Sequence, residues 1–459
     1  MRFDHLFSEK RVGSEKASSG TRSGFQRDFD RLIFSSGFRR LQNKTQVFPL
    51  PGTAFVHNRL THSLEVASVG RSLGRLVGEA IAKPFQHIHE PAWEFYKYEL
   101  PNVVAAACLA HDIGNPAFGH SGEKAISAYF IDNAGLQVDG RSLRSYYNDA
   151  QWADLTAFEG NANAIRMLTH QFKGKFRGGY GLTYTTIAAL LKYPCESVAV
   201  DKNWRHRKKY GFFQSEKDTV LQIMQELGMM EESANPLVYK RHPFVYLVEA
   251  ADDICYNIVD MEDAQRLGIL SKHEVESIFF DVLKKINRPG EDVSKTSRYY
   301  SELQDINEAI AFLRAKVINA LTELAAEIFI SNQESILEGT YNQTLIGAIE
   351  DHTQALADVV DISVKRIYNH HTVVQVEIAG YNVMSELLDL FIPAMLRDAP
   401  TMKQQKVLQL VPFQFTDFRN AKTGYDKTMN ALDLISGMTD EYATELYRRV
   451  KGIDIPKHG

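Results

Sequence analysis

The chain has 459 residues, of which 44% are hydrophobic and 24% are charged, and its formal net charge is -5. This is ordinary globular composition with enough apolar material for a sizeable core, and the charge argues against a protein that coats nucleic acid. No stretch of about 18 apolar residues occurs and no apolar signal region opens the chain, so we expect a cytoplasmic protein without a membrane partner. The three cysteines form no CxxC pair, which predicts buried thiols.

Residues 1–24 are polar and rich in Ser, Gly, Lys and Arg, which predicts an arm that is flexible unless a neighbour or ligand orders it. From Phe25 the apolar residues recur at helical spacing. After a break at Pro49 and Pro51, a helix over residues 58–71 places His62 on its apolar face. A histidine in such a place is more often a core residue than a metal ligand, so His62 alone decides nothing.

The apolar residues 103–110 predict a buried helix, which leads into the sequence HDIGNPAFGHSGE at residues 111–123. His111 and Asp112 therefore stand side by side where Gly114 and Pro116 break the helix. A neutral imidazole and an ionised carboxylate suit Mg, Mn, Fe or Zn. Taken alone, a hydrogen-bonded or capping pair is the simpler interpretation.

Beyond Glu123 the sequence is mixed and polar to about residue 155, and residues 158–168 and 182–191 then predict two helices. Residues 202–213 form a basic, aromatic run. Its charge suits phosphates, but such a run is also typical of a solvated face.

Residues 246–263 predict a helix with six carboxylates, which are costly to bury without a cation or hydrogen-bond donors. Asp252, Tyr256 and Asp260 are spaced four apart and so lie on one stripe of this helix. A partly solvated acidic face would explain them equally well.

Amphipathic helices dominate the chain beyond residue 270, for example over residues 306–325 and 380–396, and the best local strand signal is the short segment 373–377. No repeat or low-complexity linker divides the chain.

Three predicted helices thus offer metal donors from apolar surroundings, namely His62, His111 with Asp112, and Asp252. Two imidazoles and two carboxylates would bind one divalent ion and leave positions open for water and a substrate oxygen. The set has no cysteine, which disfavours a structural zinc site.

The order H…HD…D, with HDIGNPAFGHSGE in its middle, resembles the HD-domain phosphohydrolases, and within them the bacterial branch of the deoxyguanosine triphosphate triphosphohydrolase (dGTPase/dNTPase) family. Further matches span residues 22–450. They are FQRD at 25–28, FRRLQNKTQV at 38–47, NRLTHS at 58–63, FEGN at 158–161, LTY at 182–184, EAADDI at 249–254 and DLISGMTD at 433–440.

The resemblance implies an all-α, multi-helix HD-domain fold with small β content. The implied reaction hydrolyses deoxynucleoside triphosphates, dGTP among them, to deoxynucleoside and inorganic triphosphate, and so controls dNTP pools. It also implies one divalent metal ion per active site, Mn, Mg or Fe, held by His62, His111, Asp112 and Asp252. Asp252 is preferred to Asp253 because the family's ligand directly follows the Ala of the Ala-Asp element.

His120 matches the family's catalytic histidine, and Glu123 follows at i+3, close enough to orient its imidazole or hold its proton. Whether His120 acts as nucleophile or acid is open from the sequence. Asn115 stands where some relatives carry a second histidine, which argues against a two-histidine acid mechanism.

Substrate contacts are assigned by the same resemblance. Tyr256 and Asp260 match positions that hold the sugar, where the carboxylate accepts from the 3′ hydroxyl and the ring packs where a 2′ hydroxyl would clash. Other contacts, to the sugar or base edge and to the phosphates, are expected from Gln46, Arg59, Lys192, Tyr193 and Lys209.

We expect a single helical body over residues 1–459, with an HD catalytic core at 55–265 and a C-terminal helical region at 270–459 that packs on it. The implied partners are a dNTP substrate, a nucleotide or single-stranded DNA as a candidate effector, and further copies of the chain in a homo-oligomer, namely a hexamer.

Two other functions fit part of the pattern. A different HD phosphohydrolase, such as a nucleoside monophosphatase or an alarmone hydrolase, would release phosphate or pyrophosphate, but the Tyr256 and Asp260 stripe argues against it. A nucleic-acid-binding regulator would keep the fold without turnover, but the four ligands, His120 and Glu123 are all present.

Overall fold

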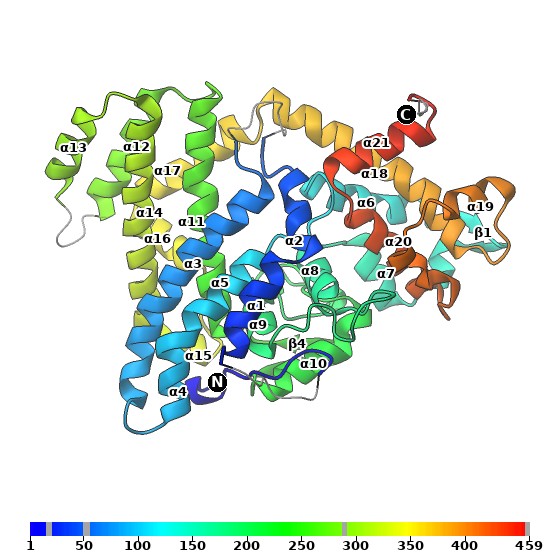
Figure 1. Cartoon of the computed structure of the whole chain (residues 1–459), viewed down its shortest axis with the longest axis horizontal. Helices are drawn as coiled ribbons and strands as arrows, with labels where there is room; N and C mark the ends of the chain where they lie inside the picture. Colours follow the sequence, from blue (N-terminus) through cyan, green and yellow to red (C-terminus); the bar gives the residue numbers. More distant parts are fainter. Residues whose placement is uncertain (15–20, 49–55, 287–291, 455–459) are drawn as a thin grey trace.

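Helices form most of the chain, as expected for an all-α fold (Figure 1). The computed structural model describes residues 1–14, 21–48, 56–286 and 292–454. The first half contains α1 (Gly24–Ile33), α2 (Ser36–Arg40), α3 (Arg59–Ala82), α4 (Glu90–Glu94), α5 (Leu100–Ala110), α6 (His120–Asp132), α7 (Asp149–Thr156), α8 (Gly160–Thr169), α9 (Tyr184–Leu190), α10 (Lys217–Glu226) and α11 (Pro243–Arg266). The second half contains α12 (Lys272–Ile286), α13 (Val293–Glu302), α14 (Ile306–Ser331), α15 (Gln333–Leu337), α16 (Leu345–His352), α17 (Gln354–Ile362), α18 (His371–Leu396), α19 (Met402–Leu408), α20 (Gly424–Ser436) and α21 (Asp440–Val450).

The β content of the described residues is two small antiparallel hairpins. They pair β1 (Gln137–Val138) with β2 (Arg141–Ser142), and β3 (Glu231–Ala234) with β4 (Leu237–Tyr239). The all-α prediction with minor β content is therefore confirmed. Among the described helices, none combines the length and the apolar character needed to cross a membrane.

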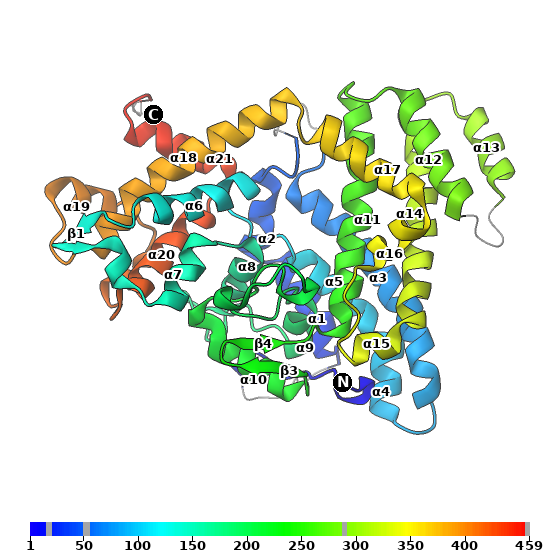
Figure 2. The same ribbon diagram turned by 180° about the vertical axis from the view of Figure 1, so that it is seen from behind.

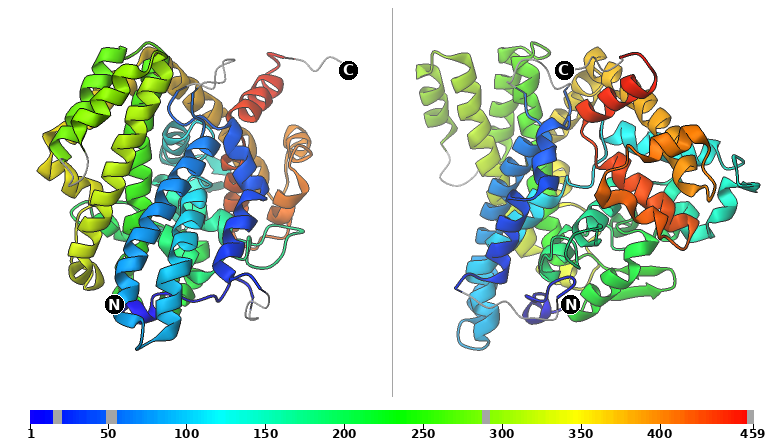
Figure 3. Two further views of the ribbon diagram at one scale, coloured as in Figure 1. Left: turned by 60° about the vertical axis from the view of Figure 1, so that its left-hand side comes forward. Right: turned by 45° about the vertical axis from the view of Figure 1, so that its right-hand side comes forward.

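The centre of the first core is the pair α3 and α5, which run side by side in both views of Figure 3. α5 is buried along almost its whole length, and α3 faces it with Gly70, Gly74 and Gly78. A Cβ atom at Gly70 would lie 2.5 Å from the Cys108 sulfur, and one at Gly74 would lie 2.9 Å from Pro101 Cα. The glycines therefore permit a backbone approach that a larger residue would prevent.

A second core lies around α6, α18 and α20. Helix α18 joins the two cores, since Val373 near its start packs in the first core while Val383 and Leu396 belong to the second. Figure 2 shows this helix running from α17 toward α19.

Two details differ from the sequence expectations, whereas the arm meets the condition under which it was expected to be ordered. Neighbouring segments hold residues 1–14, where Leu6 is buried and Arg11 pairs with Asp28 at 2.6 Å; residues 15–20 lie outside the described part. The segment 373–377 is helical within α18, because a long apolar helical stripe overrides the local preference of valine for strands. Helices α6 and α7 occupy the stretch that looked merely mixed and polar.

The two cores are also joined by a buried ion-pair network around Arg166 on α8. Its guanidinium donates to both oxygens of Asp433 at 2.6 and 2.7 Å and to Glu216 at 2.9 Å. Both carboxylates are buried as well. Such a network is far costlier to break on one side than to remove entirely.

We predict that Arg166→Met lowers the free energy of unfolding by about 3–5 kcal/mol, because it leaves two buried carboxylates without their cation. Urea unfolding followed by circular dichroism measures the change. Arg75→Met is the matched control, since Arg75 is 75% exposed and pairs with Glu79 on the surface, and it should change stability by less than about 1 kcal/mol. Equal effects of the two substitutions would contradict the prediction.

Candidate metal centre and active site

Four of the expected donors meet where α3, α5 and α11 pack together. Candidate ligand atoms of His62, His111 and Asp112 all lie within 4.8 Å of one another. Asp252 on α11 completes the group, with its Oδ1 3.2 Å from His62 Nε2 and 3.5 Å from His111 Nε2. The helix packing thus gathers two imidazoles and two carboxylates from distant parts of the chain.

The hydrogen bonding of His111 fits a metal ligand. Its Nδ1 lies 2.6 Å from the Cys108 carbonyl oxygen, to which it donates, so in the neutral ring Nε2 keeps the free lone pair. His111 Nε2 is buried and has no hydrogen-bond partner among the described residues. Buried polar atoms are normally satisfied, and a fixed tautomer with an orphaned nitrogen is what a histidine ligand requires.

The two adjacent aspartates of α11 lie in different electrostatic surroundings. Burial opposes ionisation of Asp252, but His111 and His62 hold its pKa well below the usual range. Burial, together with the charges of Glu249 and Asp252, raises the pKa of Asp253 to about 7 against the opposing effect of a lysine. It is Asp252, the residue preferred from the sequence, whose carboxylate reaches both imidazoles.

Asp112 is oriented by two neighbours. Arg59, the first residue of α3, donates from Nη1 to Asp112 Oδ2 at 2.9 Å, and the Asn115 side chain donates to Asp112 Oδ1. Burial favours the protonated acid, but Arg59 and the histidines lower the pKa of Asp112. The Arg59 guanidinium also lies beside Gly119, where a Cβ would be 2.5 Å from Nη2. Arg59 therefore bridges the metal donors and the residue before His120.

His120 begins α6 and points away from the core. Its side chain is 74% exposed, and its Nδ1 donates to Glu123 Oε2 at 2.7 Å. Glu123 Oε1 accepts from the Gly160 backbone N–H at 2.7 Å. Burial disfavours the charged form of Glu123, but these contacts and the nearby Lys209 lower its pKa. The ionised carboxylate thus fixes the ring and leaves His120 Nε2 directed outward.

A buried lysine holds the turn between the metal donors and His120. Lys44 Nζ donates to the Asn115 carbonyl at 2.5 Å and to the Ser436 carbonyl at 3.0 Å. Burial and the charge of Arg40 lower the pKa of Lys44 to about 7, although Asp440 acts in the opposite direction. In the sequence, Lys44 is notable only as part of the segment FRRLQNKTQV, and no pattern there predicts this contact.

The sugar-binding candidates lie together with a residue that the sequence analysis missed. Tyr368 donates from its hydroxyl to Asp260 Oδ2 at 3.0 Å, and its ring stacks on Tyr256 with centroids 5.3 Å apart. Burial raises the pKa of Asp260 well above its usual value, against the effect of this hydrogen bond. Tyr368 has no motif around it and comes from the turn before α18, so only the fold could identify it. Gln46 Oε1, another candidate contact, is buried without a partner among the described residues.

Lys192 lies next to the metal donors, and with His111 and Asp252 it lines a small cavity of about 40 Å³. Its Nζ is 3.3 Å from Glu249 Oε1. Glu249 also binds Arg241 at 2.8 Å, and these cations lower the pKa of Glu249 to about 2 despite burial.

The other expected phosphate contacts are placed differently. Lys209 Nζ pairs with Glu159 at 2.8 Å, in the electrostatic field of Glu123 and so on the His120 side of the site. Tyr193 is buried, and the Arg241 guanidinium lies 5.7 Å from its ring centroid. The structure therefore brings Lys192 close to the candidate metal donors and Lys209 close to Glu123.

Asp440, the first residue of α21, accepts two backbone hydrogen bonds from the catalytic half of the chain. The Thr45 N–H donates to one oxygen at 2.8 Å and the Phe118 N–H donates to the other at 2.9 Å. Phe118 lies in the turn that leads to His120. The C-terminal region thus fixes the position of this turn.

We predict that Asp440→Asn lowers the free energy of unfolding by about 1–3 kcal/mol, because an amide oxygen cannot serve both donors in the same way and one buried N–H loses its partner. Hydrogen exchange at the Thr45 and Phe118 amides should become faster. Glu441→Gln, on the exposed neighbour, is the control. Unchanged protection of both amides in Asp440→Asn would contradict the prediction.

Comparison with known proteins identifies two matching family models, an HD domain at residues 59–192 and a phosphohydrolase-associated domain at residues 346–449. The chain is 37% identical to a deoxyguanosinetriphosphate triphosphohydrolase-like protein of Synechocystis, over 99% of this chain and all of that protein. A protein of the same description from Pseudomonas aeruginosa strain PAO1 is also 37% identical, with equal coverage. The deoxyguanosinetriphosphate triphosphohydrolase of Klebsiella pneumoniae subsp. pneumoniae is 30% identical over 94% of both chains.

Proposed function

Because the chain belongs to the deoxyguanosine triphosphate triphosphohydrolase family of HD-domain proteins, we propose that it hydrolyses deoxynucleoside triphosphates, dGTP among them, to deoxynucleoside and inorganic triphosphate. Family membership makes it a metal-dependent phosphohydrolase. The observation that supports the proposal best is the donor group at His62, His111, Asp112 and Asp252, in which His111 Nε2 is buried without a partner among the described residues.

These four residues are the proposed holders of one divalent ion, for which Mn, Mg and Fe are the candidates. When bound, such an ion polarises a phosphate oxygen and lowers the pKa of a water molecule. Arg59 and Asn115 keep Asp112 in place through its two oxygens. The protein thereby supplies oriented carboxylates next to the imidazole nitrogens of His62 and His111.

Proton transfer is the proposed role of His120 and Glu123. The carboxylate holds Nδ1–H at 2.7 Å, so that Nε2 faces the substrate side and exchanges a proton at the α-phosphate or at the leaving 5′ oxygen. Glu123 is itself fixed by the Gly160 N–H. An imidazole oriented in this way has its reactive nitrogen defined before the substrate arrives.

Substrate selection is proposed to rest on the cluster of Tyr256, Asp260 and Tyr368. Asp260 would accept from the 3′ hydroxyl, and the Tyr256 ring, which stacks on Tyr368, would pack where a 2′ hydroxyl would clash. Arg59 and Lys192 are the proposed contacts for the phosphates because they lie beside the metal donors. Gln46, Tyr193 and Lys209 complete the proposed substrate contacts.

We predict that each dNTP that serves as substrate yields deoxynucleoside and triphosphate in equal amounts. The test incubates the four dNTPs, singly and mixed, with Mn or Mg and separates the products by ion-exchange chromatography. Chelation with EDTA should abolish turnover and added metal should restore it. Release of phosphate or pyrophosphate instead would identify a different HD phosphohydrolase, and single-stranded DNA binding without any turnover would favour a regulator.

We also predict that two single substitutions separate metal binding from proton transfer. Asp112→Ala should lose both bound metal and turnover, whereas His120→Ala should keep its metal while kcat falls by about 10²–10⁴-fold. Metal content is measured by mass spectrometry after gel filtration. His87→Ala, at an exposed histidine outside the site, is the control and should keep both. Loss of metal from His120→Ala would refute the division of roles.

A further inference from the structure

The cations beside the candidate metal donors share one carboxylate, that of Glu249. This residue lies on α11, three residues before Asp252, so the two side chains occupy neighbouring positions on the helix surface. Its side chain is 1% exposed and lines the small cavity of about 40 Å³ that Lys192, His111 and Asp252 also line. Glu249 is therefore part of the wall of the candidate site, although none of the roles proposed above uses it.

Three cations from separate segments reach this carboxylate. Lys192 Nζ lies 3.3 Å from Glu249 Oε1, and Arg205 Nη2 lies 3.4 Å from the same oxygen. Arg241, two residues before α11, donates to Glu249 Oε2 at 2.8 Å. One negative charge is thus shared by three positive charges, and these four side chains together carry a net positive charge.

Arg241 also fixes the backbone of the other two cations. Its Nε donates to the Lys192 carbonyl at 2.9 Å, and its Nη2 donates to the Arg205 carbonyl at 3.4 Å. The Arg241 side chain is 1% exposed, so these contacts are shielded from water. The ion pair of Arg241 with Glu249 therefore holds each of the other two cations at both ends, by its carbonyl and by its charged head.

Arg205 has donor capacity that the protein does not use. Its Nε is buried and has no hydrogen-bond partner among the described residues, although buried polar atoms are normally satisfied. Its side chain as a whole is 32% exposed, and its backbone N–H donates to the Asn342 side chain at 2.7 Å. A guanidinium that is anchored, partly exposed and incompletely hydrogen-bonded is well suited to bind an anion.

The neighbouring Lys208 shows that the positive potential here is not cancelled. It is exposed and forms no ion pair with a carboxylate in the described part of the chain. The charge of Arg205 lowers the pKa of Lys208 most, followed by burial and by the charges of Lys192 and Lys209. Glu249 acts in the opposite direction but does not outweigh them. A surface on which cations repel one another in this way favours an anionic ligand.

We propose that Arg205 binds the phosphate chain of the substrate together with Lys192, and that Arg241 and Glu249 are a positioning pair that presents both cations and limits how tightly the anion is held. The anion is the triphosphate part of the substrate and then the inorganic triphosphate product, so the proposal rests on the proposed function. Glu249 competes with the phosphates for the same cations. This competition speeds release of the product, since differences in affinity between related complexes lie mostly in the dissociation rate.

The binding test titrates inorganic tripolyphosphate into the full-length protein as purified, without nucleotide, and measures its affinity by isothermal titration calorimetry. Arg205→Gln should weaken binding by about tenfold, because charge-assisted hydrogen bonds are lost. Glu249→Gln should instead strengthen binding by about tenfold, because the competing charge is removed while the shape of the side chain is kept. A merely structural role of Glu249 would weaken binding, so the direction of the change separates the two roles.

Glu232→Gln is the matched control. Glu232 also shares its carboxylate with three side chains, but it does not line the cavity beside the candidate metal donors; its partners are His206, Arg207 and Lys240. Because solvent and salt screen a charge outside the site, this substitution should change the affinity for tripolyphosphate by less than about twofold.

A double variant tests the positioning role even where Glu249→Gln is too unstable to purify. Removal of Glu249 alone leaves the buried Arg241 without its counter-charge, whereas removal of both partners avoids this cost. Arg241→Met with Glu249→Gln keeps the local net charge but frees Lys192 and Arg205. It should therefore bind tripolyphosphate about tenfold more weakly than the parent protein, because the cations are no longer held in place.

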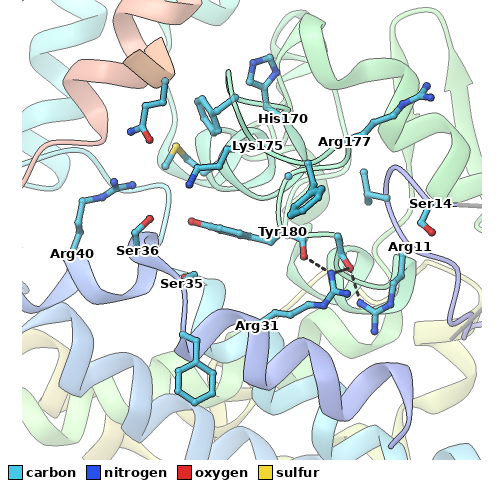
Figure 4. Close-up of a pocket in the computed structure, with 18 of the residues that line it drawn as sticks. Arg11, Ser14, Arg31, Ser35, Ser36, Arg40, His170, Lys175, Arg177 and Tyr180 are labelled. Atoms are coloured by element: carbon cyan, nitrogen blue, oxygen red, sulfur yellow. Dashed lines mark hydrogen bonds between the residues drawn. The ribbon is translucent and has the colours of Figure 1, made fainter. Parts of the chain in front are cut away.

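A separate cationic cavity provides the control for location. It measures about 790 Å³, contains Arg31, Arg40 and Lys175 in its lining and shares no residue with the cluster around Glu249 (Figure 4). Tripolyphosphate binding that Arg40→Gln weakens and Arg205→Gln does not would place the anion there and overturn the proposal. A folded Glu249→Gln protein without tighter binding, or a double variant with the affinity of the parent, would overturn it as well.

Product inhibition links the binding result to turnover. With dGTP as substrate, tripolyphosphate should inhibit Glu249→Gln at about tenfold lower concentration than the parent protein. Equal inhibition of the two proteins would disprove the role of Glu249 in product release. A parent protein that binds tripolyphosphate through Arg205 but hydrolyses no dNTP would refute the proposed function and leave the calorimetric result standing.

Discussion

The close packing of α3 on α5 is the constraint on which the rest of the site depends. Gly70, Gly74 and Gly78 let the two helices approach, since a Cβ atom at these positions would overlap Cys108, Pro101 and Tyr96. At this separation His62, one turn into α3, faces His111 at the end of α5, with ring centroids 5.3 Å apart. The third helix, α11, then adds its aspartate against both rings. Burying these carboxylates is costly unless they are compensated; Arg59 pairs with Asp112, and the two imidazoles face Asp252.

The C-terminal region positions residues of the candidate site although it contributes none of the four candidate donors. Its Asp440 accepts from two backbone amides of the catalytic half, and the carbonyl of Ser436 shares the Lys44 ammonium with Asn115. Tyr368, from the same half of the chain, completes the aromatic wall beside Asp260. Contacts such as that of the Phe118 N–H with Asp440 join the residues that match the HD domain to those that match the phosphohydrolase-associated domain.

The sequence predicts features that depend on short spacings between residues. Helical periodicity or a continuous motif predicts the all-α class, the helix with Asp252, Tyr256 and Asp260 on one face, and the His120–Glu123 pair. The sequence does not predict contacts between distant residues. The segment 373–377 is helical because the apolar face of α18 continues far beyond it. No residue pattern near Tyr368 or Asp440 predicts their partners, which lie more than a hundred residues away. The nucleotide or DNA effector, the hexamer and the division into core and C-terminal region stay predictions.

The net charge of the chain likewise does not show how its charged residues are distributed. A value of -5 suggests an acidic protein, yet its cations are not evenly spread. Around Glu249, one buried carboxylate is shared by Lys192, Arg205 and Arg241, so a phosphate that arrives there completes a network that is already partly balanced.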